Sequence, residues 1–286
     1  MLKGMHMLKI AVAQFEPDAD PSTNLHTLIG MAKDAAGQGA QLLLAPEGSL
    51  VRFLDDPSAP TRCAEPLDGP FVAGLRRASA DHDITIAAGT FTTDGSNGRV
   101  HNTLVVAQGG QLVGAYRKVH LYDAFAFVES DSVAPGDAAP PVVEIAGVAV
   151  GFATCYDLRF PELFRVLQAG GAQVLALASA WVAGPLKEEH WLTLLKARAI
   201  ENTCYTIASD QVGAKSIGRS AAFDPMGLPL LDMGTVDGAL AYVTVDPARV
   251  AGVREMLPAV SHIRFAVNPR PAEPTPGHPP LGSVAL

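Results

Sequence analysis

The stretch Gly147–Leu167, GVAVGFATCYDLRFPELFRVL, decides how the fold of this chain is interpreted. Small and β-branched residues at 148–153 predict a buried strand, and Pro161 opens a helix after a short polar corner. Cys155 lies in that corner. A side chain at a strand-to-helix turn projects beyond the sheet edge, where backbone N–H groups near Tyr156 can hold a developing oxyanion. The stretch alone fits a small core cysteine equally well, because free cysteine is commonly buried.

The composition describes a globular chain and argues against several classes of function. Of 286 residues, 48% are hydrophobic and 17% are charged, so the chain is not expected to be disordered. The formal net charge of −8 argues against a nucleic-acid partner, since such proteins concentrate Lys and Arg on one face. The uncharged segment 166–186 is interrupted by glycine and proline, which favours buried α/β core over a membrane span.

The three cysteines point to a reducing compartment. Cys63, Cys155 and Cys204 are too few and too unevenly spaced for a disulfide framework, and no Cys/His cluster has the spacing of a zinc site. The N-terminal segment lacks the apolar core and cleavage site of a secretory signal. We therefore expect a cytoplasmic protein without a metal or another cofactor.

The first half of the chain places two polar residues at the ends of strands. After a strand at 9–14 and a helix that we expect Asn24 to cap, the apolar strand 41–44 stops at a Pro-Glu-Gly turn containing Glu47. In open α/β sheets, ligands bind at the carboxyl ends of strands. A helix at 70–82 and a strand at 84–88 repeat the pattern. A hairpin at 100–107 and 111–117 then leads directly into Lys118.

The second half alternates strands and helices again. A long segment at 124–141 without clear periodicity contains Phe127 and Glu129, and a segment of this length in a compact domain is commonly functional. Further strands are expected at 142–145, 173–177, 204–209, 220–223, 228–231 and 239–245, with a helix at 186–201. Trp181 follows the second of these strands. The pattern is layered α/β, which leaves open a doubly wound sheet, a barrel or a two-sheet sandwich with outer helices.

Three of these elements end in residues that would form an acyl-transfer site if they converged on one sheet edge. Glu47 could accept the thiol proton of Cys155, while the ammonium of Lys118 could stabilise the thiolate and an oxyanion. A free thiol titrates near ~8.5, so an adjacent base and cation would make it nucleophilic at neutral pH.

The motifs around these residues resemble the nitrilase superfamily of carbon–nitrogen hydrolases. They are Pro46-Glu47, the run YRKVHL at 116–121 followed by Asp123, and CYDLRFPEL at 155–163. The resemblance extends to Glu129-Ser130, Trp181, His190-Trp191 and the run ARAIEN at 197–202.

The resemblance implies an αββα sandwich that pairs as a homodimer, with residues 8–266 as one hydrolase domain and 267–286 as a tail rich in proline and glycine. It implies that Glu47 is the general base, that Cys155 forms a thioester, and that Lys118 and the backbone near Tyr156 hold the oxyanion. Glu129 matches the second glutamate of the family, which orients the substrate and the lysine. No cofactor is implied.

The closest similarity is to the amidase branch that includes ω-amidase and deaminated-glutathione amidase, which implies a small amide substrate bearing a carboxylate. An N-carbamoyl amino acid hydrolase or a nitrilase is an alternative, although the single arginine after the cysteine, Arg159, counts against the former. Tyr122, Phe127, Arg159 and Trp181 are the candidate substrate-binding residues, and each aromatic among them also fits hydrophobic packing. A binding protein that kept the fold without activity, or a different cysteine enzyme, are the remaining hypotheses.

Overall fold

Two six-stranded sheets form the centre of the computed structural model, which describes residues 7–93, 98–125 and 127–267. The first sheet contains, in spatial order, β14 (Ala239–Val245), β1 (Leu8–Gln14), β2 (Leu42–Leu44), β3 (Thr85–Thr92), β4 (His101–Gln108) and β5 (Gln111–Arg117). The second contains β13 (Pro229–Asp232), β12 (Ala221–Phe223), β11 (Tyr205–Asp210), β10 (Val174–Ser179), β9 (Val148–Thr154) and β8 (Val142–Ile145).

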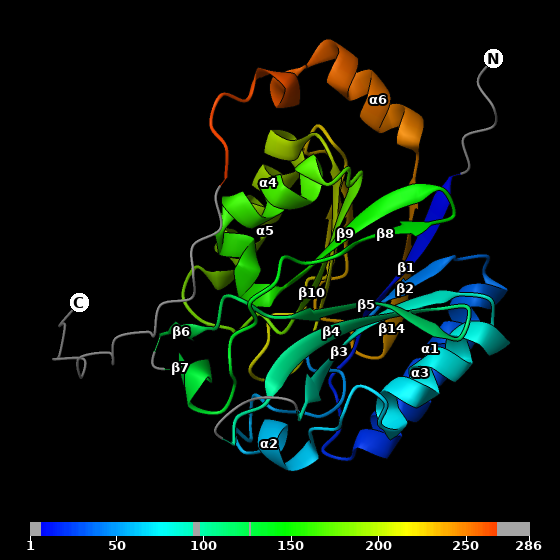
Figure 1. The fold of residues 1–286 in the computed structure, drawn as a ribbon, viewed down its shortest axis with the longest axis vertical. Coiled ribbons are helices and arrows are strands. Elements are labelled where there is room, and N and C mark those ends of the chain that lie inside the picture. The colour runs from blue at the N-terminus through cyan, green and yellow to red at the C-terminus, as the bar shows by residue number, and fades with distance from the viewer. Residues whose placement is uncertain (1–6, 94–97, 126, 268–286) are drawn as a thin grey trace, which may run out of the picture.

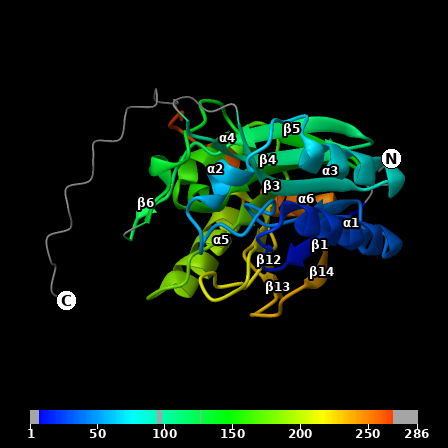
Figure 2. The same ribbon diagram turned by 90° about the horizontal axis from the view of Figure 1, so that it is seen from below.

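Helices cover the outer face of each sheet. Helices α1 (Pro21–Gly37) and α3 (Pro70–Asp81) pack on the first sheet, and α4 (Pro161–Ala169) and α5 (Lys187–Asn202) pack on the second (Figures 1 and 2). The αββα sandwich implied by the sequence resemblance is thereby confirmed, and a barrel or a single doubly wound sheet is excluded.

The layering explains why several strands are apolar throughout. In β2, Leu43 joins the core beneath the helices, whereas Leu42 and Leu44 join the core between the two sheets. Strand β10 behaves in the same way, with Leu175 facing the helices and Ala176 facing the other sheet. Successive side chains of a strand point to opposite faces, so a strand buried on both faces loses its polar alternation.

The strand directions bring the chemically important ends together. Strands β1, β2 and β3 are parallel, and β5 runs in the same direction because β4 is antiparallel to both of its neighbours. In the second sheet β9, β10 and β11 are parallel. The Gln211 side-chain amide, just after β11, donates to the Glu47 carbonyl oxygen at 2.7 Å, so these two edges meet.

Several local expectations were wrong. Asp20 caps α1 through the N–H groups of Ser22 and Thr23, while Asn24 lies inside the helix and bridges Asp18 to the Leu50 carbonyl. Because proline at N1 needs no hydrogen-bond acceptor, Pro21 can open the helix earlier than the polar pattern indicated.

Shorter elements complete the described chain. Cys63 ends the short helix α2 (Ala59–Cys63), and neither this helix nor α6 (Pro247–Met256) was predicted from the sequence. The segment expected to be irregular contains β6 (Asp123–Ala124), β7 (Phe127–Val128) and the 3₁₀ turn η1 (Glu129–Asp131). The remaining 3₁₀ turns are η2 (Cys155–Arg159) and η3 (Ala259–His262).

The predicted tail, apart from Val267, lies outside the described residues. None of the helices in the described ranges combines the length and apolar character needed to cross a bilayer.

Candidate active site

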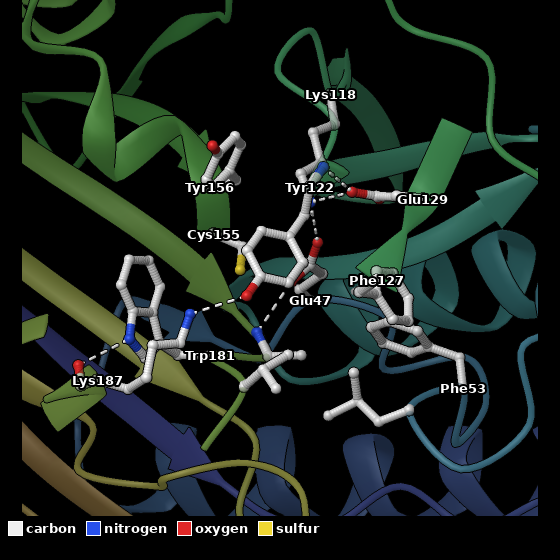
Figure 3. A pocket seen from close by; sticks show the side chains of 13 residues that line it. Glu47, Phe53, Lys118, Tyr122, Phe127, Glu129, Cys155, Tyr156, Trp181 and Lys187 are labelled. Atoms are coloured by element: carbon white, nitrogen blue, oxygen red, sulfur yellow. Dashed lines mark hydrogen bonds and ion pairs between the residues drawn. The ribbon is translucent and has the colours of Figure 1, made fainter. Parts of the chain in front are cut away.

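One cavity gathers the residues that the sequence placed at the ends of separate strands. Glu47 lies in the turn after β2, Lys118 follows β5, and Cys155 is the first residue of η2 after β9. Figure 3 shows their side chains directed into the same space. The cavity has a volume of about 20 Å³, and a second cavity of about 320 Å³ shares Phe53, Phe127 and Glu129 with it.

The backbone at Cys155 is held in a conformation that few residues adopt. Its φ angle is +44°, in the left-handed region, which is costly for a residue with a β-carbon. Asp157 anchors the turn, because its carboxylate accepts the Thr154 N–H at 2.9 Å and the Tyr116 hydroxyl at 2.9 Å. The other oxygen lies 2.7 Å from His120 Nδ1. These contacts set the direction of the Cys155 side chain.

Two carboxylates hold the buried ammonium. Lys118 Nζ lies 2.8 Å from Glu47 Oε1 and 2.8 Å from Glu129 Oε2, and all three side chains are almost fully buried. The Asn102 amide donates to Glu47 at 2.8 Å and to Glu129 at 3.0 Å, so it also links the two carboxylates. Glu129 also accepts the Tyr122 N–H at 2.7 Å. Charge-assisted bonds of this kind fix the geometry tightly.

The environment keeps the cation charged and the thiol protonated. Burial by itself would lower the pKa of Lys118, but the charges of Glu129 and Glu47 outweigh it and hold that pKa well above the usual value. Burial, reinforced by the charge of Glu47, raises the pKa of the Cys155 thiol well above its usual value, although Lys118 opposes this. The resting cysteine is therefore a thiol, which must lose its proton as it attacks.

The position of Glu47 depends on close backbone packing. Its second oxygen accepts the Ala180 N–H at 2.9 Å. A β-carbon built on Gly89 would lie 2.4 Å from Gly48 N and 2.6 Å from Glu47 Cα. Only glycine allows the turn that carries Glu47 to approach β3 this closely.

The predicted residues separate into those that line the cavity and one that does not. Tyr122, Phe127, Tyr156 and Trp181 line it, together with the catalytic candidates. Arg159 does not. Its guanidinium lies 4.9 Å from the ring centroid of Trp181, which does line the cavity, and 3.4 Å from His190 Nδ1.

Sequence reasoning missed two residues of the site. Asn102 carries only a weak signal, because it lies between two other polar residues, His101 and Thr103, in the hairpin strand that precedes Lys118. Lys187, the first residue of α5, lines the cavity and has no motif around it that would have singled it out. Within the described ranges, no group of three or more His, Cys, Asp or Glu side chains is arranged to hold a metal ion.

Comparisons with known proteins agree with this geometry. The family model described as carbon-nitrogen hydrolase matches residues 9–255. A deaminated glutathione amidase from Escherichia coli O157:H7 is 40% identical over 257 residues, covering 90% of this chain and 97% of the relative.

Two solved structures have a similar fold. A CN-hydrolase superfamily protein from Xanthomonas campestris, with an arsenic adduct in its active site, aligns with a TM-score of 0.81 at 28% identity. The alignment covers 92% of this chain and 100% of the Xanthomonas protein. A variant of the amidase from Nesterenkonia sp. AN1, with acrylamide added at the active site cysteine, aligns with a TM-score of 0.72 at 27% identity. That alignment covers 87% of this chain and 98% of the other.

Proposed function

This chain belongs to the carbon–nitrogen hydrolase family and is an amidase, and we propose that it cleaves small, carboxylate-bearing amides to acid and ammonia through a Cys155 thioester. The observation that carries the proposal is the ion-paired Glu47 and Lys118 lining one buried cavity with Cys155. A base, a cation and a thiol in one site supply the groups that nucleophilic acyl transfer requires. A fold that had lost its activity would not need to retain all three.

The first half of the reaction forms the acyl-enzyme. Glu47 accepts the proton of the Cys155 thiol as sulfur attacks the amide carbon, and the carbonyl π electrons move to oxygen. The Lys118 ammonium and the Tyr156 N–H hold the resulting oxyanion. That N–H belongs to the first turn of η2, where backbone donors have no partner within the helix. Glu47 then protonates the departing nitrogen, the C–N bond breaks, and ammonia leaves.

The second half releases the acid. Glu47 removes a proton from water as its oxygen attacks the thioester carbon, and the same donors hold the second oxyanion. Collapse breaks the C–S bond, and the sulfur recovers its proton from Glu47. Asn102 and Glu129 do not touch the reacting atoms and act by positioning Glu47 and Lys118.

Support for a carboxylate on the substrate comes from the relative described as deaminated glutathione amidase and from the cation at Arg159. Because Arg159 does not line the cavity, its positive charge would attract a substrate carboxylate electrostatically, without direct contact. Tyr122 and Phe127 form apolar wall next to the catalytic groups.

We also infer a cytoplasmic homodimer. Three free cysteines fit a reducing compartment. The exposed apolar side chains of Leu230, on the edge strand β13, and of Leu228, just before that strand, fit burial against a second copy. Light scattering of the purified chain tests the dimer, and a monomeric mass would refute it without affecting the chemistry.

The test of the function is ammonia release from a panel of small amides, N-carbamoyl amino acids and nitriles, read together with intact mass. Wild type should release ammonia from carboxylate-bearing amides and accumulate a Cys155 acyl adduct. Cys155→Ala should lose both. Cys63→Ala is the matched control, because Cys63 lies outside the cavity, and it should behave as wild type. Equal turnover by wild type and Cys155→Ala would refute the mechanism.

A further inference from the structure

Lys187 is a charged residue of the cavity wall that the mechanism above does not use. Only 4% of the residue is exposed, and its Nζ donates to the Tyr122 hydroxyl at 3.0 Å (Figure 3). The same atom lies 4.8 Å from the Tyr122 ring centroid, 4.7 Å from that of Phe125 and 5.1 Å from that of Trp181. Aromatic faces attract a cation but do not neutralise it.

The charges around the cavity are unbalanced on the side of Lys187. Ion pairs join Lys118 to Glu47 and Glu129. In the part of the chain that the structure describes, neither Lys187 nor Arg159 takes part in an ion pair. Burial, followed by the nearby Arg159 charge, lowers the pKa of Lys187 below its usual value. These five side chains therefore leave one positive charge in surplus, and a single anionic group would balance it.

We propose that Lys187 is the specificity-determining residue for substrate charge, binding the carboxylate at the end of the amide remote from Cys155. This assignment rests on the proposed amidase function and adds the residue that selects the substrate. A carboxylate suits the site because one ammonium in an apolar enclosure offsets one charge. A phosphate dianion would leave uncompensated charge near Glu47.

The small volume of the cavity suggests that the Tyr122 hydroxyl occupies Lys187 until a substrate enters. A volume of about 20 Å³ is room for about one water molecule, so an amide of several carbons enters only as side chains move apart. In the closed cavity, the Lys187 ammonium donates a hydrogen bond to the neutral hydroxyl oxygen of Tyr122. A substrate carboxylate replaces that oxygen with a charged acceptor, which is the stronger partner.

The experiment compares two amides of the same shape and different charge. Glutaramate carries a carboxylate, and 5-oxohexanamide replaces it with a methyl ketone. For Lys187→Met, KM for glutaramate should rise by about tenfold or more, with less than about a threefold change for 5-oxohexanamide. Glutarate should inhibit wild type competitively, and Lys187→Met should weaken this inhibition by a similar factor.

Two further variants make the outcome specific. Lys187→Arg should recover part of the preference for glutaramate, because it keeps the charge with a different shape. Lys9→Met is the matched control, since Lys9 also faces an aromatic ring, 4.9 Å from the Tyr242 centroid, but lies outside the cavity. It should leave both KM values unchanged.

The outcomes separate the two proposals. If wild type hydrolyses neither amide nor any other member of the panel, the amidase proposal fails. If wild type hydrolyses both amides and Lys187→Met changes their KM values by the same factor, Lys187 has only a structural role and the present assignment is overturned. Unaltered glutarate inhibition of Lys187→Met would overturn it equally.

Discussion

Replacing Asp157 tests whether the strained backbone at Cys155 is held by the carboxylate beneath it. Asp157 is fully buried, and it accepts hydrogen bonds from Thr154 N–H and the Tyr116 hydroxyl while facing His120. In Asp157→Asn, the amide oxygen can accept both bonds, and the NH₂ group can donate to His120 once that ring adopts the other tautomer. Only the charge is lost, so the free energy of unfolding should fall by about 1–2 kcal/mol.

Asp157→Ala removes every acceptor at once. The Thr154 N–H and the Tyr116 O–H are left as buried donors without an acceptor, each at about 1–3 kcal/mol, so the free energy of unfolding should fall by about 3–5 kcal/mol. The positive φ at Cys155, which costs about 1–2 kcal/mol, should then relax. A shift of the Cys155 sulfur by about 1 Å is expected to lower kcat by about 100-fold, against less than about tenfold for Asp157→Asn.

Urea denaturation gives the two unfolding free energies, and ammonia release at saturating amide, below the midpoint of unfolding, gives kcat. The informative result is that Asp157→Ala loses more stability and more kcat than Asp157→Asn. Equal stability and equal kcat for the Ala and Asn variants would show that the carboxylate does not hold the turn. A stable Ala variant with normal kcat would refute the reasoning altogether.

Two other positions give independent tests. Gly89→Ala should lower kcat by about tenfold or more, because its β-carbon collides with the backbone at Glu47. Gly30→Ala, at an exposed position of α1 with open space around it, should instead stabilise the protein by about 0.5–1 kcal/mol. Assays and thermal melts of both variants check this, and a fully active Gly89→Ala would contradict it. Burial raises the pKa of Cys204 from its usual 9.0 to about 11, so its contribution to stability is complete below pH 9 and is lost as the pH rises towards 11. Between these values the free energy of unfolding of wild type should fall by about 2–3 kcal/mol more than that of Cys204→Ala, measured by denaturation under reducing conditions, and parallel slopes would contradict this.

Predictions that depend on local sequence patterns were accurate, and those that depend on contacts between distant residues were not. Strands such as β2 and β10 were recognisable because continuous apolar runs require burial on both faces. The first helix began earlier than expected, since Asp20 and Asn24 are both plausible caps and only the hydrogen bond from Asn24 to the distant Leu50 carbonyl distinguishes them. The family motifs then brought the αββα sandwich within reach, although the alternation of elements alone had left three architectures open.

The amino-acid sequence by itself determined that Glu47, Lys118 and Cys155 each follow a strand, because strand ends are marked by local changes in polarity. Tertiary structure alone decided what surrounds them. The Asn102 bridge joins residues 55 and 27 positions away, and the Lys187–Tyr122 contact spans 65 positions. Such contacts depend on how two sheets and a helix terminus are placed in space, and no local pattern of side chains encodes that placement. For the same reason Arg159, four residues after Cys155 in the sequence, does not line the cavity, while the distant Lys187 does.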